Sequence, residues 1–345
     1  MRVLSVVSDP SGLVQVAPVA RALEATGAVE HAIIHTGRHD NPRLAETCAD
    51  LELPAVRYHL EVGDSSLGVQ AGLMLQRLDP ALTDLQPGVV LAYGDDDAAT
   101  VAAVATGALG IRFGHVEAGL RHGETAGGDA MSTLVADRLA DVLFAPSRDA
   151  TVALKAEGVA EERIQFVGSV RVDALRWVLE RSSAREPTGC IVARLQGSGG
   201  GTEVAGALAE LGRHVPVVTA PDAYRERVAL VAGAALVITD TDDLQEETSY
   251  LGVPCITLRS DTDHPATCQH GTNRLVAAGR DTLLAAADRA LSRRPPASPL
   301  IERWDGRAAE RIARVLCEGA DFGSEQDPVA AAPRGRRAMA LPQMG

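Results

Sequence analysis

The chain has 345 residues, a formal net charge of −13 at pH 7, and a composition that is 46% apolar and 23% charged. This length and composition predict a soluble, globular protein with two domains. The acidic balance argues against nonspecific binding to nucleic acids or anionic membranes, because both require clustered Lys and Arg. It is compatible with a small-molecule ligand, including a cationic one.

The cysteines and the N-terminal segment favour a cytoplasmic protein. Five cysteines are scattered without a Cys-x-x-Cys spacing, so we expect neither a disulfide framework nor a zinc site. The sequence opens directly into a strand-like run, with no apolar segment of signal-peptide length. No apolar run is long enough to span a bilayer.

In the first half, short apolar runs alternate with segments of helical periodicity. We predict strands at residues 3–7, 31–35, 89–93, 111–116, 142–145 and 164–167. We predict helices at residues 13–25, 41–50, 67–77, 98–106, 132–139, 148–157 and 172–181. Such alternation predicts parallel strands joined by right-handed helical crossovers.

The alternation resumes in the second half, after a polar and unpatterned stretch. We predict strands at residues 191–193, 215–219, 236–239 and 255–258. We predict helices at residues 202–211, 222–231, 244–251, 282–291 and 307–317. From about residue 320 the sequence is rich in Pro, Gly, Ala and Arg and has no periodicity, which is typical of a disordered tail.

These patterns predict an α/β protein with two Rossmann-like, doubly wound parallel-sheet domains that face a cleft. The expected parts are a first domain at residues 1–180, a linker at 181–188, a second domain at 189–303, a terminal helical segment at 304–319 that packs back on the first domain, and a disordered tail at 320–345. A cleft between two such domains is a usual place for a ligand.

One polar stretch, residues 114–121, follows a predicted strand and marks the expected site. It reads Gly-His-Val-Glu-Ala-Gly-Leu-Arg and brings His115, Glu117 and Arg121 within seven residues. Ligands of open α/β sheets gather at the carboxyl ends of strands. We therefore expect these side chains at the floor of the cleft.

The chain resembles a known family in this stretch and in several others. Matching strings, in chain order, are Thr36-Gly37-Arg38-His39, Gly94-Asp95, residues 115–121, residues 168–175, Gln245-Glu246-Glu247, residues 251–254, Arg259 and Asp305-Gly306. In this combination they are similar to the non-hydrolysing UDP-N-acetylglucosamine 2-epimerases, two-domain enzymes of the glycosyltransferase-B (GT-B) type. The resemblance implies a two-domain GT-B fold and a homodimer. It implies no cofactor and no metal.

The resemblance also implies catalytic residues. The family's carboxylates remove and replace the proton at sugar C2 while the nucleotide leaves from C1 and returns. Asp95 and Glu117 match two of these carboxylates, and Asp129 would stand in for the third, although the surrounding motif is changed. Neighbouring carboxyls in a cleft can hold different pKa values, as acid–base catalysis needs. The alternative is that these residues are loop residues that cap helices.

Other residues are expected to bind the substrate. Arg121 would position it, and His115 would act as an acid–base partner or as a hydrogen-bonded structural residue. The second domain would contribute Thr241, Asp242, Asp243, Glu246, Glu247 and Arg259.

The nucleotide-binding motifs of the family are altered in this sequence. The N-terminal loop is Ser-Asp-Pro-Ser-Gly at residues 8–12, Gln15 stands at a Lys position, and residues 195–197 lack the family's His. The turn at residues 240–243 carries three aspartates. At about 4 Å and an effective dielectric near 20, one like-charge contact costs on the order of 4 kcal/mol, so we expect weak UDP binding. These acidic residues could instead meet a hard cation or an amino-sugar ammonium group.

The leading hypothesis is an enzyme, an isomerase that acts on a sugar or nucleotide sugar by acid–base chemistry at C1–C2. One alternative is a glycosyltransferase or glycosyl-cleaving enzyme on the same scaffold. Another is a non-catalytic binding relative that retains only the fold.

Overall fold

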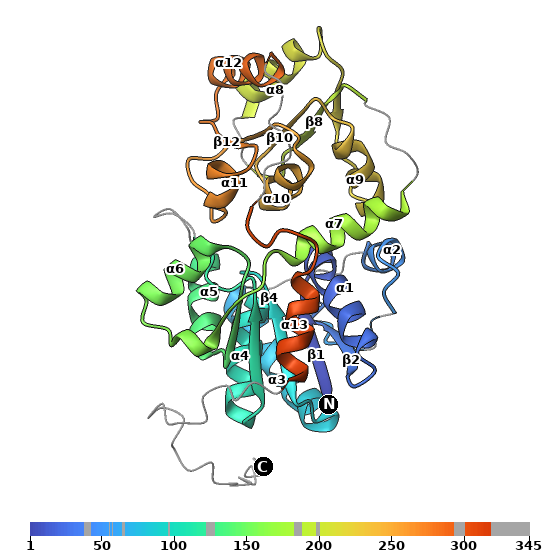
Figure 1. Cartoon of the computed structure of the whole chain (residues 1–345), viewed down its shortest axis with the longest axis vertical. Coiled ribbons are helices and arrows are strands. Elements are labelled where there is room, and N and C mark those ends of the chain that lie inside the picture. The colour runs from blue at the N-terminus through green and yellow to red at the C-terminus, as the bar shows by residue number, and fades with distance from the viewer. Residues whose placement is uncertain are drawn as a thin grey trace, which may run out of the picture.

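The chain forms two parallel β-sheets, one in each half of the sequence. The computed structural model describes residues 1–37, 43–54, 56, 58–63, 66–95, 97–121, 128–182, 188–197, 201–292 and 301–318. Most of the linker expected at 181–188, and the whole tail expected at 320–345, lie outside the described residues. Figure 1 shows the two domains stacked along the long axis of the molecule, with helix α7 between them.

The first domain carries, within the described residues, a seven-stranded sheet with helices on both faces. Its strands are β1 (Arg2–Val7), β2 (Glu30–His35), β3 (Tyr58–His59), β4 (Val89–Tyr93), β5 (Arg112–Val116), β6 (Val142–Ala145) and β7 (Ile164–Phe166). Its helices are α1 (Pro10–Ala25), α2 (Leu44–Asp50), α3 (Leu67–Leu85), α4 (Asp97–Leu109), α5 (Gly128–Leu139), α6 (Arg148–Ala156), the 3₁₀ turn η1 (Glu161–Arg163) and α7 (Val170–Arg181).

The second domain carries a five-stranded sheet within the described residues. Its strands are β8 (Ile191–Arg194), β9 (Val217–Thr219), β10 (Leu236–Thr239), β11 (Cys255–Thr257) and β12 (Asn273–Leu275). Its helices are α8 (Gly201–Leu211), α9 (Tyr224–Ala232), α10 (Asp242–Leu251), α11 (Pro265–Gln269) and α12 (Arg280–Leu291); the last helix is α13 (Ala308–Cys317).

The strand orders place a crevice in each domain. The first sheet runs β3-β2-β1-β4-β5-β6-β7 and the second β12-β11-β10-β8-β9, and the recorded pairings are parallel. The order reverses between β1 and β4 and between β8 and β10. Such reversals are the switch points where open α/β sheets bind ligands, so the loops after these four strands are the natural binding loops.

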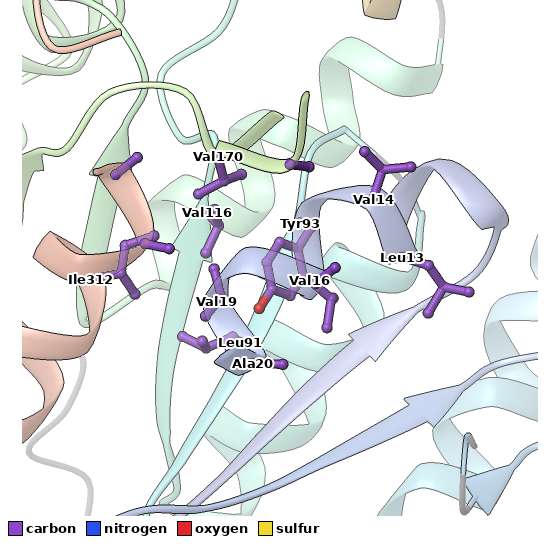
Figure 2. Packing of buried hydrophobic residues seen from close by; sticks show 14 of the residues in the cluster. Leu13, Val14, Val16, Val19, Ala20, Leu91, Tyr93, Val116, Val170 and Ile312 are labelled. Atoms are coloured by element: carbon purple, nitrogen blue, oxygen red, sulfur yellow. The ribbon is translucent and has the colours of Figure 1, made fainter. Parts of the chain in front are cut away.

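Helix α1 packs its apolar side chains between the sheet, α7 and α13. Asp9 is its N-cap and accepts a hydrogen bond from the Gly12 N–H at 2.8 Å, while Pro10 fits the first helical position. The helix therefore begins three residues before the predicted start. Figure 2 shows Val16 and Val19 of α1 in the same cluster as Ile312 of α13.

The terminal helix α13 belongs to the core of the first domain. The Asp173 carboxylate on α7 accepts hydrogen bonds from the N–H groups of Ala308 (3.2 Å) and Ala309 (2.7 Å), so it caps the start of α13. Trp304 is buried just before the helix and donates from Nε1 to the Pro146 carbonyl at 3.0 Å. These bonds return the chain from the second domain to the first (Figure 1).

The predicted elements agree with the structure except at short or terminal pieces. The sequence patterns missed β3, β12 and α11, and they ended α3 eight residues early, at residue 77. None of the helices in the described part of the chain has the length and apolar character needed to cross a membrane.

The two domains also touch directly beside α2. The Arg225 N–H of α9 donates to Asp50 Oδ2 at 3.2 Å, and its Nη2 donates to Glu52 Oε1 at 2.9 Å. The same guanidinium lies 5.3 Å from the ring centroid of Trp177 on α7, within the range of a cation–π contact. This contact joins α9 of the second domain to α2 and α7 of the first.

Candidate active site

A cleft of about 750 Å³ lies between the domains and is lined by the loops after β1, β4, β8 and β10. These are the loops at the two switch points. Of the predicted site residues, the cleft is lined by Asp95, Glu117, Thr241, Asp242, Asp243 and Glu246. The structure therefore brings together the acidic residues of both domains.

Asp95 and Glu117 lie at the same edge of the sheet, just after two neighbouring strands. They follow β4 and β5, whose last residues Tyr93 and Val116 are partners in the sheet. Glu117 is 5% exposed and has a φ of +66°, in the left-handed region that residues other than Gly seldom adopt. Backbone strain of this kind is typical of functional sites, and here it turns the carboxyl into the cleft.

A buried group of three side chains holds these two loops in place. His115 Nδ1 donates to Asp137 Oδ1 at 2.6 Å, and its Nε2 donates to the Gly94 carbonyl at 2.7 Å. Asp137, on α5, also accepts from Arg121 Nη1 at 2.7 Å and from the Gly119 N–H at 3.0 Å. Because both ring nitrogens face acceptors, His115 is an imidazolium that joins the loop after β4 to the loop after β5.

His115 and Arg121 therefore lie behind the cleft instead of lining it. The His115 ring is fully buried, and Arg121 is held by Asp137 and by Glu157, whose Oε1 lies 2.6 Å from Arg121 Nε. Burial alone would lower the pKa of His115, but the charge and hydrogen bond of Asp137 raise it. The polar atoms of both side chains are engaged within the protein, which favours a structural role over direct contact with a substrate.

The side chain of Gln15 holds one oxygen of Glu117. Gln15 Nε2 donates to Glu117 Oε2 at 2.5 Å, whereas Oε1 has no hydrogen-bond partner within the described part of the chain. Both residues line the cleft. Glu117 thus presents one restrained and one available oxygen to a ligand.

Glu117 is mainly protonated at neutral pH. Burial raises its pKa, the nearby Glu246 raises it further, and Arg171 and His264 lower it, with a resulting value of about 8. Asp95 also acts to raise this pKa, so the two carboxyls are close enough to influence each other. A carboxylic acid kept neutral beside a second carboxyl is an arrangement suited to acid–base catalysis.

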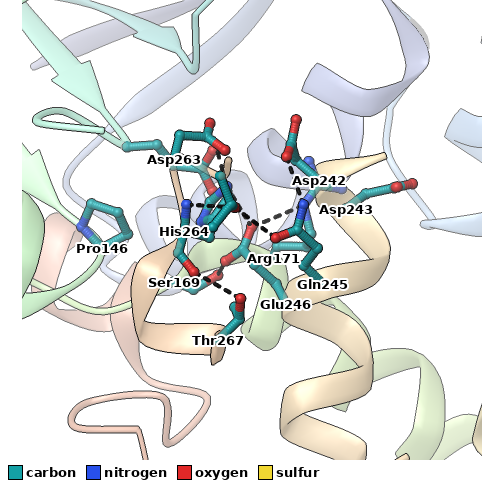
Figure 3. Close-up of polar contacts among 12 residues, drawn as sticks. Pro146, Ser169, Arg171, Asp242, Asp243, Gln245, Glu246, Asp263, His264 and Thr267 are labelled. Atoms are coloured by element: carbon teal, nitrogen blue, oxygen red, sulfur yellow. Dashed lines mark hydrogen bonds and ion pairs between the residues drawn. The ribbon is translucent and has the colours of Figure 1, made fainter. Parts of the chain in front are cut away.

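The second domain contributes Glu246 and His264 to the cleft lining (Figure 3), and the charges of both act on the pKa of Glu117. Glu246 Oε2 accepts from Ser169 Oγ at 2.5 Å, and Glu246 Oε1 lies 3.4 Å from Arg171 Nε and 3.9 Å from His264 Nε2. Burial would lower the pKa of His264, but Asp263 and then Glu246 raise it to about 9. His264 is therefore a buried cation at neutral pH.

Arginines offset the aspartates of the 240–243 turn. Asp243 Oδ2 lies 3.2 Å from Arg227 Nη2, and Asp242 Oδ1 accepts from Arg259 Nη1 at 2.6 Å. Burial would raise the pKa of Asp243, but Arg227 and other groups lower it to about 2. Burial and Asp263 raise the pKa of Asp242 to about 6. The turn is therefore less repulsive to an anion than the sequence alone predicts.

The remaining predicted residues do not line the cleft. Glu247 is fully buried behind Glu246, 3.8 Å from Arg227, and burial raises its pKa to about 7. Arg259 contacts Asp242 from outside the cleft. Asp129 lies in the first turn of α5, and its side chain falls outside the described residues.

Several residues that line the cleft were not among the predicted site residues, including Gln15, Arg171 and His264. Arg171 is an arginine between two valines at the buried start of a helix, and that conflict with the apolar pattern was a usable signal. His264 lies in a polar loop, where a histidine is not unusual, and Gln15 was marked only as the residue at a Lys position of the family. Among the described residues, no group of three or more His, Cys, Asp or Glu side chains could hold a metal ion.

Comparison with known proteins gives a consistent result along the chain. The sequence model of the family described as UDP-N-acetylglucosamine 2-epimerase matches residues 21–198 and 199–317. The chain is 27% identical to the UDP-N-acetylglucosamine 2-epimerase of Methanocaldococcus jannaschii, across 89% of this chain and 96% of that protein. It is 26% identical to the UDP-2,3-diacetamido-2,3-dideoxy-D-glucuronate 2-epimerase of Pseudomonas aeruginosa, across 92% of this chain and 100% of that protein.

Solved structures share the two-domain arrangement. The crystal structure of the M. jannaschii UDP-GlcNAc 2-epimerase with UDP-GlcNAc and UDP matches with a TM-score of 0.84 at 26% identity, over 92% of this chain and 100% of that one. The enzyme from Neisseria meningitidis bound to UDP-GlcNAc matches with a TM-score of 0.82 at 20% identity, over 92% and 100%. These likenesses show the expected α/β fold of the GT-B type.

Proposed function

Because the chain belongs to the UDP-N-acetylglucosamine 2-epimerase family, we propose that it is an isomerase that interconverts the C2 epimers of a nucleotide-linked acetamido sugar in its interdomain cleft. The relatives act, by their names, on UDP-N-acetylglucosamine and on a UDP-diacetamido-glucuronate. Neither a glycosyl transfer nor a purely binding role is favoured by these relatives.

The observation that supports this proposal most strongly is the placement of Asp95 and Glu117. Both line the cleft from adjacent strand ends, and the pKa of Glu117, raised by burial to about 8, keeps it mainly protonated. A single site therefore holds a carboxyl able to donate a proton and a second carboxyl able to accept one.

The chemistry follows from the weak acidity of the C2–H bond. Removal of this proton is feasible when the C1–O bond breaks at the same time, because the electron pair then forms a C1=C2 double bond and the nucleoside diphosphate departs. Return of the diphosphate to C1 with a proton on the other face of C2 gives the epimer. We assign proton acceptance to Asp95 and proton donation to Glu117, with the roles reversed in the opposite direction.

The other cleft residues support binding. We assign Glu246, Thr241, Asp242 and Asp243 to contacts with hydroxyl or amide groups of the ligand, since all four line the second-domain wall. His115 and Arg121 are positioning residues, because they hold the loops that carry the two catalytic carboxyls. Asp129 stays a prediction from the sequence resemblance.

Incubation with UDP-N-acetylglucosamine in D₂O, followed by proton NMR, tests the function. We expect deuterium to enter at C2 together with the appearance of the C2 epimer. Glu117→Gln and Asp95→Asn should each lower this exchange by about 10²- to 10⁴-fold. Glu310→Gln is the matched control, because Glu310 is exposed on α13, outside the cleft lining. Substrate binding without any C2 exchange in the unchanged protein would refute the epimerase.

We also propose that the protein is a homodimer that pairs through α3, α4 and α5. Exposed large apolar side chains on these neighbouring helices are Val69, Val104, Leu109, Met131, Leu134 and Leu139. An exposed apolar surface of this kind is typical of an interaction site. Light scattering should give a dimer mass for the unchanged protein and a monomer mass for a Leu134→Asp/Leu139→Asp variant.

A further inference from the structure

We infer that Arg171 and His264 form a binding site for an oxyanion of the substrate, next to Glu117. The inference rests on the proposed function and deepens it. The ligand would present one of two oxyanions to this part of the cleft. One is the diphosphate that leaves from C1, and the other is a carboxylate on the sugar ring.

Arg171 has hydrogen-bonding capacity that the protein leaves unused. It lies in the first turn of α7, lines the cleft and is 5% exposed. Nη2 donates to Ser11 Oγ at 3.0 Å, whereas Nε and Nη1 donate no hydrogen bond within the described part of the chain. An unpaired buried donor is costly, so a pair of them on one guanidinium indicates a place for an external acceptor.

The surrounding carboxylates keep Arg171 and His264 charged without filling their donors. Glu246 Oε1 lies 3.4 Å from Arg171 Nε and 3.9 Å from His264 Nε2, and Asp263 Oδ2 lies 3.8 Å from the same His264 nitrogen. Charge-assisted hydrogen bonds of these types are about 2.7–2.9 Å long, so these are looser ion pairs. Figure 3 shows both cations around the Glu246 carboxylate.

The usual anion-binding groups of the second domain are occupied by its own carboxylates. Asp240 accepts from the N–H groups of Gln196 and Gly197, both at 2.8 Å, in the loop after β8. Asp243 accepts from the Leu244 N–H at 2.9 Å, in the first turn of α10. These carboxylates take three backbone N–H groups that could otherwise face a ligand oxyanion, whereas Arg171 Nε and Nη1 donate no hydrogen bond within the described part of the chain.

The position also suits the reaction. Glu117 works at C2, and Arg171 and His264 are near enough to lower the pKa of Glu117. C1 is bonded to C2, so negative charge that develops on the oxygen departing from C1 arises beside the same carboxyl. A fork of N–H donors with an adjacent imidazolium stabilises that charge, and it would bind a ring carboxylate equally well.

Calorimetric titrations with UDP, inorganic diphosphate and glucuronate test this inference. The variants are Arg171→Met, His264→Gln and the charge-balanced double variant Arg171→Met/Glu246→Gln, each verified as folded by its thermal melt. Arg176→Met is the matched control, since Arg176 lies on the same helix but contacts Glu180 and the Asp305 carbonyl.

We expect the unchanged protein to bind at least one of the three anions, and the Arg171 variants to lose at least about tenfold in that affinity. Loss of UDP and diphosphate binding identifies the leaving group as the source of the oxyanion, and loss of glucuronate binding identifies a sugar carboxylate. The inference is overturned if the unchanged protein binds none of the three, or if the double variant binds as tightly as the control. Failure of the proposed function would appear separately, as an absence of C2 deuterium exchange in the unchanged protein.

Discussion

The Gln15 amide donates a hydrogen bond to Glu117 Oε2 across 2.5 Å, so the side chain that holds this carboxyl oxygen is a neutral one. Burial is the largest cause that raises the pKa of Glu117 to about 8, and Gln15 contributes no charge to oppose it. A positive charge introduced at position 15 would therefore lower the pH range in which Glu117 can act as an acid.

Replacement of Gln15 by Lys should move the pH dependence of C2 exchange to lower pH. The unchanged enzyme should lose activity above about pH 8, because Glu117 then loses the proton that it donates. An ammonium next to a carboxyl lowers its pKa by about 1–3, so the alkaline limb of Gln15→Lys should shift by a comparable amount. Rates measured by NMR between about pH 6 and pH 10 check this. Gln15→Met should not produce the downward shift, and an unchanged limb in Gln15→Lys would contradict the assignment.

Loss of Asp137 should destabilise the first domain and slow catalysis. Asp137→Asn leaves the buried His115 cation without its partner, which costs about 3–5 kcal/mol. Burial would raise the pKa of Asp137, but His115 and Arg121 lower it, so this stabilisation is lost as the pH falls through that lowered value. The pKa of His115 is raised in the folded protein, so the stabilisation that the His115 cation contributes is complete below about pH 6.5. It is lost as the pH rises through the raised pKa.

The difference in unfolding free energy between the unchanged protein and Asp137→Asn should therefore be largest between about pH 4 and pH 6.5. Urea unfolding at several pH values measures it. Glu157→Gln is the control, because the half-exposed Glu157–Arg121 pair should contribute less than about 1 kcal/mol. A difference that does not vary with pH would show that His115 and Asp137 are not a charged pair.

The sequence was sufficient to predict the alternating fold but not its smallest elements. The buried strands of the first sheet and the helices between them have clear periodicity, and their predicted bounds lie close to the observed ones. Strands β3 and β12 have two and three residues at sheet edges, where backbone pairing and not an apolar run defines them. Strand order also could not be predicted, because it depends on contacts between distant segments.

The sequence predicted those site residues that follow strands within motifs. It missed the residues whose location depends on long-range contacts. Asp95, Glu117 and Glu246 line the cleft as expected. The location of His115 behind the cleft depends on Asp137, which is 22 residues away in the sequence. The proximity of Arg171 and His264 depends on how the two domains meet, and no local pattern encodes that.

Asp243 should support stability down to low pH. Burial would raise its pKa, but Arg227 and other groups hold it at about 2, against an unfolded value near 3.9. The ionised carboxyl therefore contributes about 2–3 kcal/mol above about pH 4, and this is lost as the pH falls through about 2. Asp243→Asn should lower the unfolding free energy at pH 7, as measured in urea. The difference in unfolding free energy between the unchanged protein and the variant should disappear near pH 2. An Asn variant as stable as the unchanged protein at pH 7 would refute this role.

Asp222 should weaken nucleotide binding by occupying two arginines at the mouth of the cleft. Its carboxylate pairs with Arg43 of the first domain and, at 3.2 Å, with Arg194 of the second. Because Asp222 is half-exposed, Asp222→Ala should change the unfolding free energy by less than about 1 kcal/mol. The same change removes a negative charge from the cleft lining and releases both arginines toward a phosphate. Calorimetry should therefore show tighter UDP binding, with the gain reduced at high salt. Weaker binding in Asp222→Ala would show instead that the bridge keeps the cleft in its binding shape.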